Sequence, residues 1–371
     1  MKAEVKVCTG CGAPLQTGQP ESPGYTVASA LEREHPVCRR CFRIRHYNEV
    51  SSVAVDDDEF IKIVSEIGRK KALVVKVVDL FDLAGSWIDN LRRYIGSNPV
   101  FLVANKVDVL PKQTNLEKVE MWLRKEVEKK GILLEGIALI SAGKGYGLKH
   151  VKTFIERYAN DRDVYVVGTA NVGKSTLINR LIRTFGETGD VELTTSRYPG
   201  TTLSSVRVAI PNYKHHLIDT PGIMTSHRLS DLVCPKCLKQ IVPDRTIDPT
   251  VFQLNDKQTL FAGGLARFDF VKGERQPFVC YFANQLELHR TKLENADTLY
   301  RKHLGGLLTP PCGDCGDHLR DLVTHKIKIK EGSSKDVVIS GLGWFSARGN
   351  ECEVHVHVPR GVDVSIRRAI I

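Results

Sequence analysis

Apolar runs of strand length alternate with amphipathic stretches from about residue 60 to residue 222. The runs are rich in Val, Ile and Leu, as buried strands are, and they lie at 73–80, 100–106, 136–140, 163–168 and 215–220. Two longer stretches, 115–130 and 148–159, place apolar residues at helical spacing and contain no Pro. Strands that alternate with helices predict a mainly parallel sheet covered by helices on both faces.

The pattern changes on either side of this region. The first fifty residues include a loop rich in Pro, Gly and Ser, and an acidic turn at 56–58 follows them. Beyond Gly222 the chain contains β-type runs at 336–346 and 352–359, and the second run alternates Val with His, Glu or Cys, which is typical of a half-buried strand. The expected domains are a small module at 1–50, an α/β domain at 51–225 and a largely β domain at 226–371.

Composition adds expectations about location and partners. Of the 371 residues, 42% are hydrophobic and 26% are charged, which is typical of soluble globular proteins. No uncharged apolar stretch approaches the ~18 residues of a membrane helix, and the start of the chain lacks the pattern of a signal peptide, so we expect a cytoplasmic protein without a membrane partner. The net charge of +10 favours a polyanionic partner, although a basic surface without such a partner gives the same charge.

A Gly-rich segment at 168–175, GTANVGKS, matches the pattern GxxxxGK[ST]. It follows the predicted strand at 163–168 and opens a helical stretch, which is the context that a phosphate-binding P-loop requires. Lys174 is predicted to reach the β- and γ-phosphates, and the Ser175 hydroxyl is predicted to ligate Mg²⁺. The expected phosphate-binding residues are Asn171, Val172, Gly173, Lys174, Ser175 and Thr176.

Two further segments indicate which base is bound. In Asn105-Lys106-Val107-Asp108, the Asp108 carboxylate is predicted to accept two hydrogen bonds from guanine, a donor pair that adenine lacks. By itself this short match also fits a polar loop at the end of a strand. Its partner segment, Ser141-Ala142-Gly143-Lys144, resembles the GTPase loop whose backbone contacts the guanine oxygen. The expected base-site residues are Asn105, Lys106, Asp108, Ser141 and Ala142.

Asp219-Thr220-Pro221-Gly222 resembles the GTPase motif that senses the γ-phosphate. Asp219 is expected to anchor the Mg²⁺ shell, and the N–H of Gly222 to contact the γ-phosphate. Between this motif and the P-loop lies Pro199-Gly200-Thr201-Thr202, where a first switch belongs. Thr202 is the expected Mg²⁺-sensing hydroxyl, with Thr201 as the alternative. The expected catalytic residues are Asn171, Lys174, Thr202 and Gly222.

The motifs stand in an unusual order. In an ordinary GTPase the P-loop and the switches precede NKxD and SA[GK], whereas here NKVD and SAGK come first and the helical stretch 148–159 runs into the P-loop strand. Domain termini commonly lie close together, so such a permutation can preserve a fold.

The chain therefore resembles the circularly permuted GTPases of the YqeH type, whose members combine an N-terminal CxGC…CxRC zinc module, a permuted G domain and a C-terminal RNA-binding-like β domain. The resemblance rests on the segments from Cys8 to Cys41 and on VVDLFD, NKVD, NVGKST, PGTT and DTPG. It implies an α/β fold: a circularly permuted P-loop GTPase domain with an N-terminal zinc-ribbon-like module and a mainly β C-terminal domain.

Two residues bear on the rate of hydrolysis. Ile223 stands where many signalling GTPases place a water-orienting Gln, and an aliphatic side chain cannot hydrogen-bond the attacking water, which favours slow hydrolysis. Asn171 resembles the P-loop Asn that helps hold a potassium ion in several assembly GTPases, and such an ion would add positive charge beside the phosphates. The alternative for Asn171 is a turn residue chosen for its backbone conformation.

Eight of the ten Cys form four CxxC pairs. The first two pairs have the composition of zinc-ribbon knuckles, and four thiolates would close a tetrahedral structural Zn²⁺ site. A redox CxxC opens a helix after a strand, and neither of these pairs is expected to. The expected ligands of this site are Cys8, Cys11, Cys38 and Cys41. A second zinc site would use Cys234, Cys237, Cys312 and Cys315. The alternative is that these cysteines form two pairs that bind no metal. Cys280 and Cys352 are expected in the core.

Two classes of function remain open. The resemblance points to an assembly GTPase that uses GTP binding and slow hydrolysis to time its association with ribosomal RNA or small-subunit precursors, with ribosomal proteins as further partners. The alternative is a nucleotide-gated RNA- or protein-binding scaffold in which hydrolysis is incidental. Acceleration of turnover by ribosomes or RNA distinguishes the two. A metabolic enzyme is less favoured, because the sequence contains no further catalytic cluster.

Overall fold

The computed structural model describes residues 6–20, 22–47, 50, 54–55, 57–132, 134–186, 193–197, 204–210 and 213–371. The chain divides into two compact units. The first consists of Met1–Leu80, Ser86–Val107 and Glu120–Met224, and the second consists of Phe81–Gly85, Asp108–Val119 and Thr225–Ile371. Two short segments from within the α/β region thus belong to the second unit, and the domain boundaries expected from the sequence remain predictions.

The N-terminal part of the first unit contains the helices α1 (Ala28–Leu31) and α2 (Arg39–Tyr47). Its small interior consists of cysteine side chains, against which Leu15 and Val37 pack. So small an apolar core needs a further staple to be stable. On α2, Ile44 belongs instead to the hydrophobic core of the α/β region, so this helix connects the two interiors.

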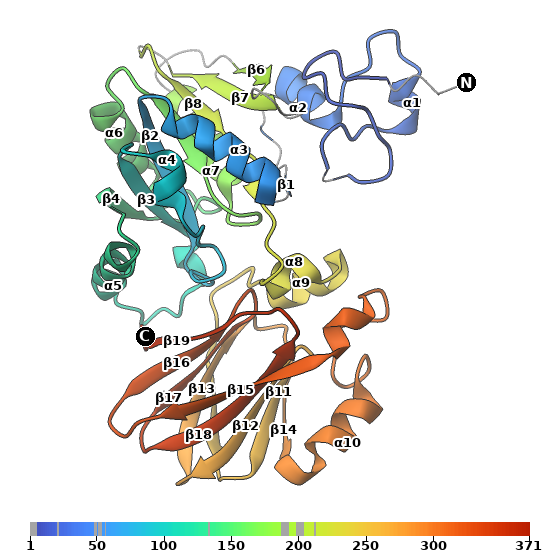
Figure 1. Ribbon diagram of the computed structural model, residues 1–371, viewed down its shortest axis with the longest axis vertical. Helices are drawn as coiled ribbons and strands as arrows, with labels where there is room; N and C mark the ends of the chain where they lie inside the picture. The colour runs from blue at the N-terminus through green and yellow to red at the C-terminus, as the bar shows by residue number, and fades with distance from the viewer. Residues whose placement is uncertain are drawn as a thin grey trace. The chain divides into compact units, whose positions relative to one another are not determined.

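A seven-stranded sheet with the order β4-β3-β2-β5-β8-β7-β6 forms the α/β region (Figure 1). Pairing is parallel from β4 through β8 and antiparallel from β8 to β6. The strands are β2 (Ala72–Asp79), β3 (Val100–Asn105), β4 (Leu134–Leu139), β5 (Asp163–Val167), β6 (Leu193–Arg197), β7 (Ser204–Ala209) and β8 (His216–Asp219). The P-loop strand β5 lies in the middle of the sheet although β2, β3 and β4 precede it in the chain, which is the permuted arrangement.

Helices cover this sheet, with α3 and α4 in front and α7 behind in the view of Figure 1. They are α3 (Asp57–Gly68), α4 (Leu91–Ile95), α5 (Leu116–Lys129), α6 (Leu148–Tyr158) and α7 (Lys174–Gly186), and a 3-10 turn spans Val107–Val109. Residues of α6 and α7 share one hydrophobic cluster with the strands. One prediction differs in detail: positions 57 and 58 of the expected acidic turn form the start of α3, and Asp56 lies outside the described residues. A short parallel pair, β1 (Ala54–Val55) with β9 (Gly222–Ile223), stands apart from the sheet.

The second unit contains two five-stranded sheets, ordered β10-β13-β17-β16-β19 and β14-β11-β12-β18-β15. The first sheet has β10 (Thr250–Leu254), β13 (Gln276–Phe282), β16 (Ser334–Ile339), β17 (Gly343–Arg348) and β19 (Val364–Arg368). The second has β11 (Gln258–Ala262), β12 (Ala266–Gly273), β14 (Leu288–Lys292), β15 (Leu322–Ile329) and β18 (Cys352–Pro359). The helices are α8 (Leu229–Leu232), α9 (Pro235–Ile241) and α10 (Leu293–His303), with a 3-10 helix at Asp317–Arg320.

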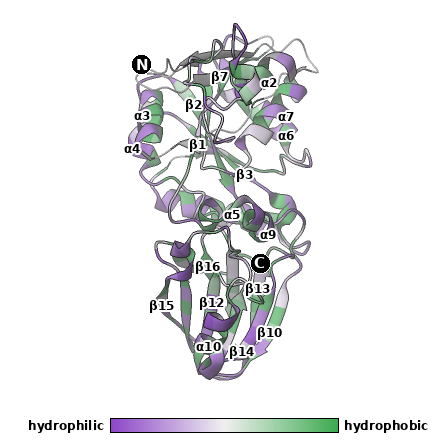
Figure 2. Ribbon diagram, turned by 90° about the vertical axis from the view of Figure 1, so that its right-hand side faces the viewer, coloured by the Kyte–Doolittle hydropathy of each residue, from purple (hydrophilic) through white to green (hydrophobic). Residues whose placement is uncertain are grey.

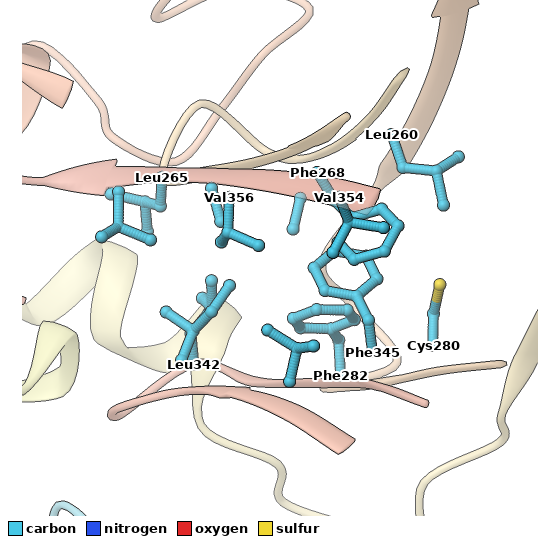
Figure 3. Packing of buried hydrophobic residues seen from close by; sticks show 14 of the residues in the cluster. Leu260, Leu265, Phe268, Cys280, Phe282, Leu342, Phe345, Val354 and Val356 are labelled. Atoms are coloured by element: carbon cyan, nitrogen blue, oxygen red, sulfur yellow. The ribbon is translucent and has the colours of Figure 1, made fainter. Parts of the chain in front are cut away.

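Side chains of the two sheets meet in one core (Figure 3). Phe268 of β12 stacks on Phe345 of β17 with ring centroids 4.5 Å apart. The Val residues of β18 are buried and alternate with half-buried polar residues, as predicted for 352–359. The run at 336–346 forms two strands, β16 and β17, which Gly341 with φ of +75° helps to join. Bands of polar and apolar colour along β15 show the same alternation at the edge of its sheet (Figure 2).

Candidate functional site

The P-loop joins the end of β5 to the start of α7, as the sequence predicts. Lys174 is buried, and its Nζ donates to the carbonyl oxygens of Gly168 at 3.0 Å and Thr169 at 2.9 Å. Asn171 and Gly173 have φ of +61° and +91°, so the loop turns through the left-handed region. A buried ammonium group beside a helix N-terminus makes a site for an anion.

Asn105 ties three of the predicted motifs together. Its Nδ2 donates to the carbonyl of Val172 at 2.9 Å, and its Oδ1 accepts from the N–H of Ala142 at 2.9 Å. A Cβ on Gly173 would lie 2.3 Å from the same Nδ2, so the close approach requires glycine in the P-loop. The NKVD, SAGK and P-loop segments therefore meet at one side chain.

The other residues of the base site lie at the ends of strands. Lys106, with φ of +68°, pairs through Nζ with Asp79 Oδ2 at 2.6 Å. Ser141 forms a bridge with Tyr146, and its Oγ accepts from the N–H of Lys144 at 3.2 Å. Asp108 lies in the 3-10 turn that follows β3. The role of Asp108 as the acceptor for a base stays a prediction.

Asp219 ends β8, and its side chain is 3% exposed. Burial raises the pKa of Asp219, and the charges of Arg40 and Lys174 oppose that rise. The Asp219 carboxylate and the Ser175 hydroxyl at the start of α7 are hard oxygen donors of the kind that suit Mg²⁺. Ser175 and Asp219 therefore fit a magnesium ion.

Gly222 and Ile223 lie against the P-loop. A Cβ on Gly222 would come within 2.9 Å of Lys174 Nζ and 3.1 Å of the Ala170 backbone, which explains the glycine. The carbonyl of Ile223 accepts from the N–H of Ala170 at 2.8 Å. The Ile223 side chain is buried, its backbone pairs with β1, and its aliphatic side chain has no group that could hydrogen-bond water.

The predicted first switch cannot be placed. Thr201 and Thr202 lie outside the described residues, together with Pro199 and Gly200. Their predicted contact with Mg²⁺ stays a prediction. Among the described P-loop residues, Ser175 is half-buried, whereas Asn171 and Thr176 are exposed.

The first cysteine cluster brings Cys8, Cys11, Cys38 and Cys41 together, with sulfur atoms within 4.8 Å of one another. The N–H of Cys38 donates to Cys8 Sγ at 3.2 Å. The hydrogen bond with the Cys38 thiol lowers the pKa of Cys11 to about 6, which favours a thiolate. Such a donor set fits a tetrahedral zinc ion.

A second cluster in the other unit has the same spacing, with Cys234, Cys237, Cys312 and Cys315 also within 4.8 Å of one another. Backbone N–H groups of Cys234 and Cys312 donate to the sulfur atoms of Cys315 and Cys237 at 3.4 and 3.3 Å. The pKa of Cys234 is lowered to about 7, mainly by a hydrogen bond from the backbone of Cys237. Pairs that are distant in sequence thus form a second donor set that fits zinc.

The structure also bears on two expectations about the cysteines. The pair Cys38 and Cys41 lies at the start of helix α2, but no strand precedes this helix among the described residues, so the pair does not have the strand-then-helix context of a redox CxxC. Cys280 and Cys352 are 1% and 3% exposed within the core of the second unit, which confirms the prediction for both.

Sequence reasoning missed one residue of the site. Arg40, the second arginine of the Cys38-Arg39-Arg40-Cys41 segment, reaches Asp219, with Nη2 3.4 Å from Oδ2. Nothing in the sequence links these two residues, which are 179 positions apart. In the described part of the chain, no helix combines the length and the hydrophobicity needed to span a membrane.

The parallel sheet with its P-loop, and the NKVD, SAGK and DTPG segments at its strand ends, define a circularly permuted P-loop GTPase domain. Residues 163–261 match the family described as 50S ribosome-binding GTPase. Residues 275–370 match the family described as YqeH-like, C-terminal. A GTPase domain binds guanine nucleotide with Mg²⁺, so the predicted nucleotide class is confirmed.

Whole-length relatives define the family. The chain is 46% identical to the YqeH protein of Bacillus subtilis, covering 99% of this chain and 100% of that protein. It is 32% identical to the NO-associated protein 1, chloroplastic/mitochondrial, of Arabidopsis thaliana, covering 98% of this chain and 76% of that protein. The chain belongs to the YqeH family, and the permuted fold class predicted from its motifs is confirmed.

More distant proteins share parts of the chain. The GTPase Era of Halothermothrix orenii is 28% identical over 43% of this chain and 52% of its own length. Among solved structures, YjeQ from Thermotoga maritima covers 43% of this chain and 54% of its own, with 20% identity and a TM-score of 0.26, which is too low to support an inference.

Proposed function

We propose that this protein is a slowly hydrolysing GTPase that associates with ribosomal RNA or with precursors of the small ribosomal subunit according to its nucleotide state. The observation that carries the proposal is the Asn105 side chain, which joins the P-loop to the NKVD and SAGK segments and so assembles one guanine site from permuted parts. The net charge of +10 supports an RNA partner.

Each predicted residue has a role in this site. Lys174 and the backbone N–H groups from Asn171 to Thr176 bind the phosphates, and Asp108 accepts from guanine with Asn105, Lys106, Ser141 and Ala142 shaping its pocket. Ser175, Asp219 and Thr202 would hold Mg²⁺, and that ion would neutralise charge that develops on the phosphates. The N–H of Gly222 contacts the γ-phosphate.

Hydrolysis is slow in this proposal because Ile223 cannot orient water and is committed to strand pairing. Asn171 lies in the loop with an exposed side chain, where it assists a potassium ion that compensates in part. Potassium should therefore raise the turnover above the rate measured in sodium.

The nucleotide state reaches the second unit through the chain that follows DTPG. Only Ile223 and Met224 separate Gly222 from Thr225, the first residue of the longest segment of the second unit. Thr225 is held there, because its N–H donates to Asp231 Oδ2 at 3.2 Å. Because this connection is short, a displacement of Gly222 on loss of the γ-phosphate is passed on to Thr225. The GTP and GDP states therefore differ in the contacts of the second unit.

Zinc ions at the two cysteine clusters are part of the proposal and serve structure, since four thiolates leave no open coordination position. Cys8, Cys11, Cys38 and Cys41 hold one ion, and Cys234, Cys237, Cys312 and Cys315 hold the other. A cytoplasmic location and contacts with ribosomal proteins also remain predictions.

Sedimentation of the protein with purified ribosomal subunits and subunit precursors tests the proposal. The protein should move with small-subunit particles in one nucleotide state, GTP analogue or GDP, and be released in the other. The matched family's description names the 50S ribosome, so large subunits belong in the same gradient. Association with neither subunit in any nucleotide state would refute the proposal.

The rate of GTP hydrolysis in the presence of small-subunit particles distinguishes this proposal from the scaffold alternative. If small-subunit particles accelerate GTP hydrolysis, the protein works as a timed GTPase. If they bind without changing the rate, and a non-hydrolysable GTP analogue and GDP still move the wild-type protein between bound and free states, hydrolysis is incidental.

A further inference from the structure

The first cysteine cluster supplies a charged side chain to the nucleotide site. Arg40 Nη2 lies 3.4 Å from Oδ2 of Asp219, and the two side chains are 12% and 3% exposed. Asp219 is the carboxylate that would hold Mg²⁺, so the arginine contacts a predicted ligand of that ion. An ion pair with so little exposure is screened far less than one on the surface.

The position of Arg40 is fixed from two directions. It lies between Cys38 and Cys41, whose sulfur atoms belong to the cluster that fits zinc. The helix α2, which begins at Arg39, carries Ile44 into the core of the α/β region. A metal ion bound to the cluster would therefore hold the base of the Arg40 side chain in place.

The chain that follows α2 is also attached to the nucleotide site. The N–H of Val50 donates to Asn179 Oδ1 at 2.7 Å, and Asn179 Nδ2 donates to the carbonyl of Val50 at 3.0 Å, which anchors this chain to the P-loop helix α7. Beyond it, β1 pairs in parallel with β9, whose residues are Gly222 and Ile223. The N-terminal part thus contacts the DTPG motif at both ends, at Asp219 and at Gly222.

We propose that Arg40 is a positioning residue for GTP hydrolysis: it holds the Asp219 carboxylate in the orientation that Mg²⁺ requires, and the zinc-loaded module holds Arg40. The inference rests on the proposed GTPase site and adds a regulatory link to it. Loss of metal from the first cluster lowers the activity of a nucleotide site that is itself intact.

Outer partners of a metal ligand typically change metal affinity or activity by about 10- to 100-fold when removed. Arg40→Ala should therefore raise the Mg²⁺ concentration for half-maximal binding of a fluorescent GTP analogue, and lower kcat, by about 10-fold or more. Arg40→Lys keeps the charge but loses the planar fork, and should recover part of both effects. The matched control is Arg39→Ala, which removes the same charge from the same knuckle at an exposed position.

The experiment is a Mg²⁺ titration of analogue binding on the zinc-loaded full-length protein, with zinc content and thermal unfolding measured for each variant. The proposal expects Arg40→Ala to keep its zinc while its Mg²⁺ requirement rises and that of Arg39→Ala does not. Cys41→Ser, which loses the metal, should reproduce the Arg40→Ala shift.

An Arg40→Ala variant with an unchanged or lowered Mg²⁺ requirement would overturn the proposal, as would an equal shift in Arg39→Ala. The binding readout stands apart from ribosome association. If the wild-type protein fails to bind ribosomal particles, the proposed partner is wrong, and the Mg²⁺ titration still decides the role of Arg40.

Discussion

Replacing Asn105 by Ala isolates the side chain on which the permuted site depends. Asn105 is 3% exposed and makes two hydrogen bonds of 2.9 Å, to the carbonyl of Val172 and from the N–H of Ala142. Each buried backbone group that loses its partner costs about 1–3 kcal/mol, so the variant should lose about 2–6 kcal/mol of stability. Because both backbone groups belong to segments that are predicted to bind the nucleotide, affinity for GDP should fall by about 10-fold or more.

The other end of the same strand offers a matched control. Asn98, just before β3, is 8% exposed; its Oδ1 accepts from Ala72, and its Nδ2 donates to Ile67 and Ile95 at 2.9 and 3.0 Å. Asn98→Ala should destabilise the protein by at least as much as Asn105→Ala, since it breaks three bonds of the same kind. It lies away from the motifs, so its affinity for GDP should stay within about threefold of the wild type.

The assay combines denaturant unfolding of each variant with equilibrium binding of fluorescent GDP under conditions where both are folded. A stability loss shared by both variants, with an affinity loss confined to Asn105→Ala, supports the assembled site. Equal affinity losses in both, or none in either, would refute the reasoning, because nucleotide binding would then be indifferent to the contact that joins the motifs.

Three further predictions concern the cysteines and a buried ion pair. The purified protein should contain two zinc ions per chain, and Cys237→Ser should contain one, as measured by metal analysis; a single ion in the wild type would remove the second site. Burial raises the pKa of the Cys352 thiol to about 11 and also raises that of Cys280, so both should stay neutral and unreactive toward a disulfide reagent at about pH 8 until the protein unfolds. Arg228 Nε lies 2.9 Å from Asp82 Oδ2, and both side chains are nearly fully buried, so Arg228→Ala should lower the free energy of unfolding by about 3–5 kcal/mol. Arg360→Ala, which breaks an exposed pair with Asp321, should lower it by less than about 1 kcal/mol in the same unfolding assay.

The sequence was most informative where burial and covalent spacing decide structure. Each predicted strand from 73–80 to 215–220 is present, because parallel strands that are buried on both faces need unbroken apolar runs. The P-loop was recognisable for a related reason: its glycines are required by the close approach of other side chains, as at Gly173. Such local requirements restrict the residue type at each position and can therefore be recognised in the sequence.

Contacts between residues that are distant in the chain could not be recognised in this way. The pairing of β1 with β9 and the ion pair of Arg40 with Asp219 depend on where α2 packs, and Ile44, an apolar residue between two arginines, does not specify its partner in the sequence. The same holds for Phe81–Gly85 and Asp108–Val119, which lie in the α/β region of the sequence but belong to the second unit. The helix α10 was also missed, since the β-type runs around it dominated the pattern.

The most direct test of the central claim, that NKVD serves a P-loop that follows it in the chain, is the base specificity of Asp108→Asn. Loss of a charge-assisted pair with guanine should cost about 2–5 kcal/mol, a decrease of about 30- to 4,000-fold in GTP affinity. Binding of xanthosine triphosphate should improve, because its additional carbonyl accepts from the new amide. Asp89→Asn, at a side chain that is 82% exposed, is the control and should bind both nucleotides as the wild type does. An Asp108→Asn protein that keeps wild-type affinity for GTP and gains none for the xanthine nucleotide would contradict the account.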